Sequence, residues 1–276
     1  MKIAFAGKGG VGKTTIAAWM ADYMARAGHN VWLVDADTAT SLGVASGLPP
    51  EATVLPLVQR RDLLEEYISS GILSLNPDVS GLPERLAVEL PASAAPLVEG
   101  ATERGVKQLL VMGTVTAAGG GCACEANALL KALLAHLIYD SSDYVLVDLE
   151  AGVEHLGRGT VASVDRLVIV SEPSLRSLET ASHIGELAAE LGLEDQILIL
   201  NRCDGDGLEL PEQLDLPKRR YFSPDLPGLR QKQLSDGSVL DLPEQPQIDE
   251  LMGALLWDHG ACPPGSLRLA QGGFST

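Results

Sequence analysis

A glycine-rich loop near the beginning of the chain constrains its fold more than any other feature. Residues 7–14 read GKGGVGKT and fit the pattern G-x-x-x-x-G-K-[ST]. The apolar run Lys2–Ala6 precedes the loop, and a stretch with one apolar helical face follows it over about residues 13–27. We therefore predict a β-strand, a phosphate-binding turn and a helix in that order.

The residue types in this loop suit phosphate chemistry. Glycines allow several backbone N–H groups to turn towards phosphate oxygens, and the N-terminal end of the next helix adds a positive dipole. We expect Lys13 to contact the β- and γ-phosphates and the Thr14 hydroxyl to bind Mg²⁺. The alternative is a glycine turn that only leads into an ordinary helix. The nucleotide ligands predicted from the loop are Gly9, Gly10, Val11, Gly12, Lys13, Thr14 and Thr15.

Short apolar runs alternate with helical stretches along the rest of the chain. This order predicts an α/β fold with a mostly parallel sheet and helices on both faces, as a single P-loop NTPase domain. We expect the domain to span residues 1–257, with an irregular insertion at 48–105 and a loose tail at 258–276. Further strands are expected at 31–34, 109–112, 144–147, 167–170, 197–200 and 220–222, a short helical patch at 63–68, and further helices at 125–139, 175–191 and 248–256.

Charge and cysteine content exclude several classes of protein. The chain has 20 Lys and Arg against 37 Asp and Glu, a net charge of −17, which disfavours binding to nucleic acid backbones. Four cysteines in 276 residues are too few for a disulfide scaffold. The glycine loop begins too early for a secretion signal, and no run of about 18 apolar residues occurs. We expect a soluble, cytoplasmic protein with reduced thiols.

Carboxylates end two of the predicted strands, at the edge where parallel sheets place their ligands. Asp148 follows the apolar run 144–147 in a Walker B pattern, so we predict that it holds Mg²⁺ through a water molecule. Asp35 and Asp37 follow the run 31–34. Asp35 is either a structural group behind the site or an ordinary carboxylate at the start of a loop.

Cys122 and Cys124 lie between three glycines and a predicted helix that starts near residue 125. Thiols at positions i and i+2 of an extended segment face the same side and suit a soft metal ion, and a helix N-terminus favours the thiolate. A closed site needs about four ligands, so a two-fold dimer would complete a tetrahedral Zn²⁺ or square-planar Ni²⁺ site. The alternatives are two small buried residues or a redox pair.

The string KGGVGKTT at residues 8–15 resembles the deviant Walker A motif of the superfamily that contains the nitrogenase iron protein and the septum-site and partitioning ATPases. The resemblance implies that Lys8 crosses a dimer interface to act on the partner's nucleotide, although a solvated loop lysine is the alternative. It also implies that Asp37 orients the attacking water and that the Gly152 N–H contacts the γ-phosphate. The predicted catalytic residues are Lys8, Lys13, Asp37 and Asp148.

The same resemblance implies a site for the base. Asn201 ends an apolar run, as does the asparagine that binds adenine in this superfamily, and Arg202 follows it. Pro224 resembles the second loop beside the adenine. The alternative for Asn201 is a turn asparagine. The sequence NRCD at 201–204 differs from the guanine-binding motif N-K-x-D only in having arginine in place of lysine. The sequence therefore does not exclude GTP as the nucleotide.

Three further strings are similar to the carbon monoxide dehydrogenase accessory ATPases of the CooC type, which assist nickel insertion. They are the C-x-C pair, EAGVEHLGRG at 150–159 and LNPDV at 75–79. The resemblance implies a Mg²⁺-dependent ATPase (ATP and water to ADP and phosphate) and an ATP-dependent homodimer. It also implies Ni²⁺ or Zn²⁺ as cargo and carbon monoxide dehydrogenase or acetyl-CoA synthase as client. The alternatives are an iron–sulfur electron-transfer ATPase and a MinD/ParA-like positioning ATPase.

Overall fold

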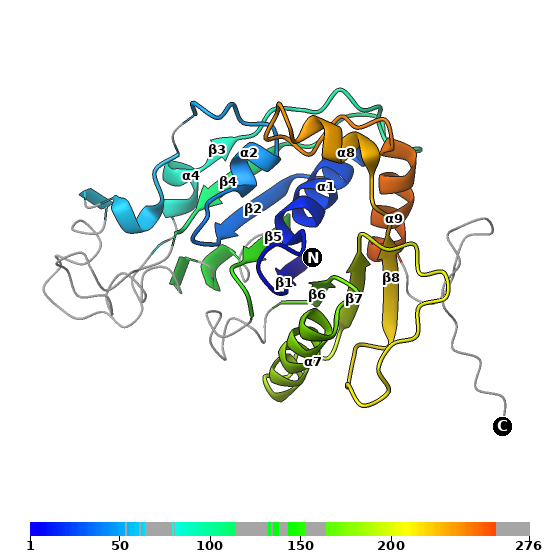
Figure 1. Cartoon of the computed structure of the whole chain (residues 1–276). Helices are drawn as coiled ribbons and strands as arrows, with labels where there is room; N and C mark the ends of the chain where they lie inside the picture. The colour runs from blue at the N-terminus through cyan, green and yellow to red at the C-terminus, as the bar shows by residue number, and fades with distance from the viewer. Residues whose placement is uncertain are drawn as a thin grey trace, which may run out of the picture.

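The computed structural model describes residues 1–52, 54–60, 62, 63, 79, 81–113, 132, 133, 135–137, 143–152 and 164–257. Its strands are β1 Lys2–Ala6, β2 Val31–Ala36, β3 Val88–Glu89, β4 Lys107–Val111, β5 Tyr144–Leu149, β6 Arg166–Ser171, β7 Gln196–Asn201 and β8 Arg219–Ser223. These eight strands form one sheet in the order β3-β4-β2-β5-β1-β6-β7-β8 (Figure 1). Within it, β3 runs antiparallel to β4, and every other neighbouring pair is parallel. The predicted α/β architecture is confirmed.

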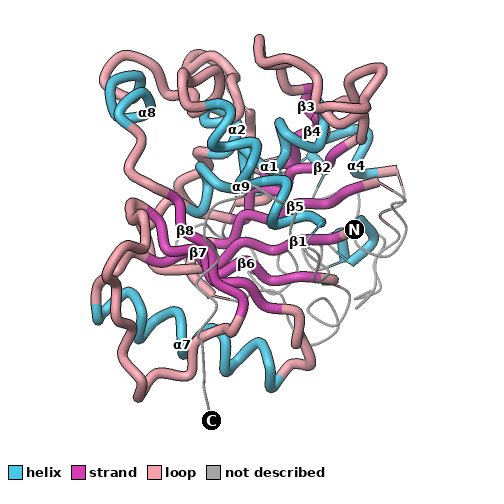
Figure 2. The backbone as a smooth tube through the Cα atoms, turned by 90° about the vertical axis from the view of Figure 1, so that its right-hand side faces the viewer, coloured by secondary structure: helices cyan, strands magenta, loops and turns pink. Residues whose placement is uncertain are grey.

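Helices cover both faces of the sheet, which explains why its strands are apolar on both sides (Figure 2). Helices α1 and α9 pack on one face with the side chains of Ile3 and Phe5, and α7 packs on the other with Ala4 and Ala6. Side chains that alternate along β1 therefore pack into two separate hydrophobic cores, one on each face of the sheet. The helices are α1 Lys13–Arg26, α2 Leu42–Ala45, α4 Leu82–Leu86, α7 Leu175–Glu190, α8 Pro227–Lys232 and α9 Gln245–Trp257, with a 3₁₀ turn η1 at Leu57–Gln59.

The long predicted elements are present, with ends that differ by one to three residues. The short elements α2, α4, α8 and β3 were not predicted, because two to six residues carry too little periodicity to show. Strand β3 lies inside the segment 48–105 and pairs with β4, so part of that segment belongs to the sheet. Of the helix predicted at 125–139, residues 132, 133 and 135–137 are described, and they are helical. Nearly all of the patch at 63–68 and the tail 258–276 lie outside the described residues.

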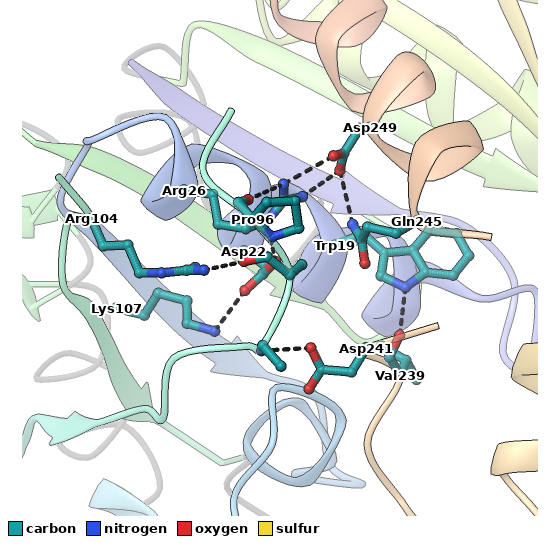
Figure 3. Close-up of polar contacts among 12 residues, drawn as sticks. Trp19, Asp22, Arg26, Pro96, Arg104, Lys107, Val239, Asp241, Gln245 and Asp249 are labelled. Atoms are coloured by element: carbon teal, nitrogen blue, oxygen red, sulfur yellow. Dashed lines mark hydrogen bonds and ion pairs between the residues drawn. The ribbon is translucent and has the colours of Figure 1, made fainter. Parts of the chain in front are cut away.

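A buried ionic cluster joins α1 to α9 and β4 (Figure 3). Arg26 is fully buried and donates hydrogen bonds to Asp22 (2.8 Å) and to Oδ2 of Asp249 (2.9 Å). Lys107 donates to the other oxygen of Asp22 (3.3 Å). Each buried charge in this group faces an opposite charge, as burial requires. The helix that follows the phosphate loop is therefore fixed in the core at its far end. No helix within the described part of the chain is both long and apolar enough to cross a bilayer.

Candidate nucleotide-binding site

The phosphate loop connects β1 to α1 at the carboxyl edge of the sheet, as predicted. Gly7 has φ 143° and its N–H donates to the carbonyl of Ala151 (2.7 Å). A Cβ atom at this position would lie 2.1 Å from the carbonyl oxygen of Val170. Gly12, with φ 101°, adopts the left-handed conformation just before α1. Gly7 is therefore required by the close approach of β6, and Gly12 by its left-handed conformation.

The two lysines of the loop lie in contrasting surroundings. Lys13 is 4% exposed, and its Nζ donates to the carbonyl of Lys8 (3.4 Å). Lys8, Gly9 and Gly10 are exposed to solvent. The two lysines therefore differ in access: Lys13 is folded onto the loop of its own chain, whereas Lys8 is open to solvent.

Asp148, near the end of β5, contacts Thr14 in the first turn of α1. The Thr14 hydroxyl donates to Oδ2 of Asp148 (2.5 Å), and Oδ1 of Asp148 is buried with no hydrogen-bond partner in the described part of the protein. Burial raises the pKa of Asp148 to about 7, the Thr14 hydrogen bond opposes this shift, and the nearby charge of Asp35 adds to it. The nearby charge of Lys13 also lowers the pKa, but burial outweighs it, so the carboxyl group is short of positive charge.

These two residues fit a magnesium ion. Mg²⁺ prefers oxygen ligands and is usually held by one or two carboxylates together with substrate phosphates. The hydroxyl of Thr14 and the unpaired oxygen of Asp148 supply such ligands beside the phosphate loop. Among the residues that the structure describes, no group of three or more His, Cys, Asp or Glu side chains is arranged to hold a metal ion by itself.

Asp35 organises the loop that carries Asp37. It is fully buried and accepts hydrogen bonds from the N–H groups of Asp37 (3.1 Å) and Leu42 (2.9 Å). Burial raises its pKa to about 6, an effect that these backbone hydrogen bonds partly offset. Asp37 is half-buried, and its Oδ1 accepts from the N–H of Ala39 (2.9 Å). These backbone contacts favour the interpretation of Asp35 as a structural residue. Asp37, on the loop that Asp35 holds, remains partly open to solvent.

The residues predicted to bind the base lie together at the ends of β7 and β8. Asn201 is 8% exposed, and Arg202 after it has φ 57° and forms an ion pair with Glu172 at the end of β6. Pro224 directly follows Ser223, which is paired with Asn201 in the sheet. Glu172 was not singled out in the sequence, although it follows an apolar run just as Asp35 and Asp148 do.

The remaining predicted site residues are Gly152 and the cysteine pair. Gly152 is buried and follows Ala151, whose carbonyl contacts the phosphate loop. Cys122 and Cys124 lie outside the described residues, and so do His155 and Cys262, which are not among the predicted ligands. Cys203, also not a predicted ligand, is a free, half-buried thiol. The fold therefore brings the predicted nucleotide ligands together at one edge of the sheet, while the cysteine pair stays a prediction from the sequence.

Comparison with known proteins agrees with this geometry. Residues 2–225 match the CobQ/CobB/MinD/ParA nucleotide binding domain, a range that includes every site residue described above. The chain belongs to this family. It is 41% identical over 228 residues to the carbon monoxide dehydrogenase accessory protein CooC of Rhodospirillum rubrum, covering 78% of this chain and 81% of that protein. It is 33% identical over 267 residues to an uncharacterized ATP-binding protein of Methanocaldococcus jannaschii, covering 93% and 98%. It is thus a CooC-like member of the CobQ/CobB/MinD/ParA family.

Solved structures of the family share the fold. The MinC:MinD cell division protein complex of Aquifex aeolicus aligns with a TM-score of 0.62 at 22% identity, over 95% of this chain and 97% of that one. MinD of Pyrococcus horikoshii, solved with Mg-ADP, aligns with a TM-score of 0.54 at 19% identity, over 86% of each chain. At these identities the likeness establishes a shared architecture, which includes the strand-loop-helix unit that carries the phosphate loop.

Proposed function

We propose that the chain is an ATP-hydrolysing metallochaperone that binds nickel between two subunits and assists its insertion into carbon monoxide dehydrogenase or acetyl-CoA synthase. The observation that carries this proposal is the 41% identity to a carbon monoxide dehydrogenase accessory protein over 81% of that protein's length. The C-x-C pair at Cys122 and Cys124 supports it, because two thiols per subunit give a dimer the four ligands of a closed site.

The hydrolytic step uses the residues predicted for the nucleotide site. Lys13, buried over the loop, neutralises charge on the β- and γ-phosphates, and the Gly152 N–H donates to the γ-phosphate. Asp37, held by its contact with Ala39, orients the attacking water. Lys8 of the partner subunit stabilises charge on the transferred phosphoryl group. Mg²⁺, held by Thr14 and Asp148, supplies further positive charge to the phosphate oxygens when bound.

Nucleotide and cargo are coupled through the dimer. ATP favours the closed dimer because each nucleotide is completed by Lys8 of the other subunit, and closure places both Cys122–Cys124 pairs around one Ni²⁺ ion. Hydrolysis and phosphate release weaken this contact, so each subunit keeps only two thiolates and the ion passes to the client. Nucleotide affinity and metal affinity must then depend on each other in both directions.

Nickel stoichiometry and oligomeric mass, measured together on anaerobic protein, test the proposal. With a non-hydrolysable ATP analogue we expect dimers with about one Ni²⁺ each, as the pooled ligand count requires, and with ADP a large loss of bound nickel. Cys122→Ala/Cys124→Ala should abolish binding, whereas the control Cys203→Ala should retain it. Equal nickel binding by the double variant would overturn the metal role. Visible absorption of the anaerobic protein would favour the alternative of an iron–sulfur electron-transfer ATPase. Nucleotide-dependent sedimentation with liposomes or DNA would favour the alternative of a positioning ATPase.

A further inference from the structure

Asn201 belongs to the predicted base site, and its side chain contacts the phosphate loop. Its Nδ2 donates a buried hydrogen bond to the carbonyl oxygen of Val11 (2.8 Å) across 190 positions of sequence. Val11 is 2% exposed and Asn201 is 8% exposed, so water does not compete well for either group. The contact therefore links the end of β7 directly to the turn that precedes Lys13.

Gly12 makes this contact possible. A Cβ atom at position 12 would lie 2.3 Å from Nδ2 of Asn201, and the φ of 101° is itself unfavourable for other residues. The last glycine of the motif thus has two roles: it permits the turn into α1, and it leaves room for the amide of Asn201. A glycine turn that only led into a helix would not need this room.

The hydrogen bond also fixes the direction of a phosphate-binding group. The peptide between Val11 and Gly12 is planar and trans, since the described residues contain no cis peptide bond. Its carbonyl and its N–H consequently point in opposite directions. With the Val11 carbonyl held against Asn201, the Gly12 N–H points away from Asn201 and cannot turn round without breaking the bond.

We propose that Asn201 is a positioning residue for the phosphate loop, acting through the Val11 carbonyl and in addition to any contact with the base. This inference rests on the proposed nucleotide site. It implies that Asn201 sets affinity for phosphate chains that carry no base. It also implies that the loop is ordered before nucleotide arrives, which lowers the entropic cost of binding.

Inorganic tripolyphosphate, which has no base or ribose, separates the two roles. Calorimetric titration with Mg²⁺ should show that Asn201→Ala weakens tripolyphosphate binding by about tenfold, as expected when a buried carbonyl loses a side-chain donor. The matched control is Cys203→Ala, a change two residues away on the same loop, which should bind tripolyphosphate within about twofold of the wild type. An asparagine that touched only the base would leave tripolyphosphate binding unchanged, and that result overturns the proposal.

Hydrogen exchange of residues 7–15 in the nucleotide-free protein gives an independent measurement. We expect faster exchange in this segment for Asn201→Ala and also for Asn201→Asp at pH 8, which keeps the size of the side chain but removes the donor. Unchanged exchange in both variants also overturns the proposal. These measurements need neither nickel nor hydrolysis, so a failed nickel assay with normal tripolyphosphate results would reject the metallochaperone proposal alone.

Discussion

The hydroxyl of Thr14 and the carboxylate of Asp148 meet at 2.5 Å, although 134 positions separate them in sequence. The contact joins the first turn of α1 to the end of β5, and it satisfies one oxygen of a carboxyl group that is 1% exposed. The other oxygen is buried without a partner among the described residues. A divalent cation would remove this imbalance, and without one the group tends to take up a proton, as its raised pKa of about 7 indicates.

The stability of the metal-free, nucleotide-free protein should fall as pH rises from about 4 to about 7. Asp148 and Asp35 have pKa values of about 7 and about 6 in the folded protein, against an ordinary pKa of 3.8 for an aspartate side chain. Between these limits the folded state binds more protons than the unfolded state, so the free energy of unfolding decreases with pH and levels off above about 7. Each unit of pKa shift corresponds to about 1.4 kcal/mol. Urea denaturation at half-unit pH steps measures the slope.

Asp148→Asn is the matched control for that slope. The amide keeps an oxygen that accepts from Thr14 but does not ionise, so the decrease above pH 6 should largely disappear and the variant should exceed the wild type in stability at pH 8. ATP hydrolysis with Mg²⁺ should fall by about a hundredfold or more, because a charged ligand is lost. A variant with the wild-type slope would show that Asp148 is not the source of the pH dependence.

Gly7→Ala should disrupt the phosphate loop while Gly9→Ala leaves the fold intact. A Cβ at position 7 would lie 2.1 Å from a backbone carbonyl, in a conformation with φ 143°, whereas a Cβ at position 9 meets nothing within 4 Å. The backbone around Gly7 must move, and we expect a loss of about 3 kcal/mol or more in the free energy of unfolding, with ATP binding abolished. Thermal or urea denaturation compares the pair. Equal stabilities would mean that the loop adapts without cost.

The nucleotide site could be predicted largely because its residues lie in strong local patterns. Glycines around Lys13, and acids directly after apolar runs, are visible in the sequence, and parallel topology brings strand ends together. The link from Asn201 to Val11 could not be predicted, because it depends on β7 lying two strands away from β1 in the sheet order. The pairing of Arg202 with Glu172 likewise arises from the adjacency of β6 and β7. The two-residue strand β3 has no periodicity of its own.

Lys8→Ala should abolish hydrolysis while ATP still binds. The Lys8 side chain is exposed, and the backbone carbonyl that accepts from Lys13 remains in the variant. We expect a loss of about a thousandfold or more in kcat, comparable to loss of an arginine finger, and a change of at most about threefold in the Kd for ATP. Steady-state kinetics and equilibrium binding separate the two effects.

Mixing variants tests whether Lys8 acts across the dimer. Neither Lys8→Ala nor Asp37→Ala should hydrolyse ATP alone. In a mixed dimer, the site with an intact Asp37 receives Lys8 from the other subunit. Random exchange of an equimolar mixture should therefore restore about a quarter of the wild-type rate, since half of the two-fold dimers are mixed and each has one complete site. If both residues acted within one subunit, mixing would restore nothing.

Arg26→Met should destabilise the protein far more than loss of an exposed ion pair. The substitution removes a fully buried guanidinium that pairs with both Asp22 and Asp249 in the cluster of Figure 3. Breaking a buried pair from one side costs about 3 to 5 kcal/mol. The control Arg230→Ala, whose side chain is 71% exposed beside Asp225, should change the free energy of unfolding by about 1 kcal/mol or less. Adding Asp249→Asn to Arg26→Met should recover part of the loss, because Asp22 keeps its ion pair with Lys107 while Asp249 loses the guanidinium that faces it. Urea denaturation at pH 7 measures all four proteins, and an Arg26→Met variant no less stable than Arg230→Ala would show that the cluster does not hold α9 to α1.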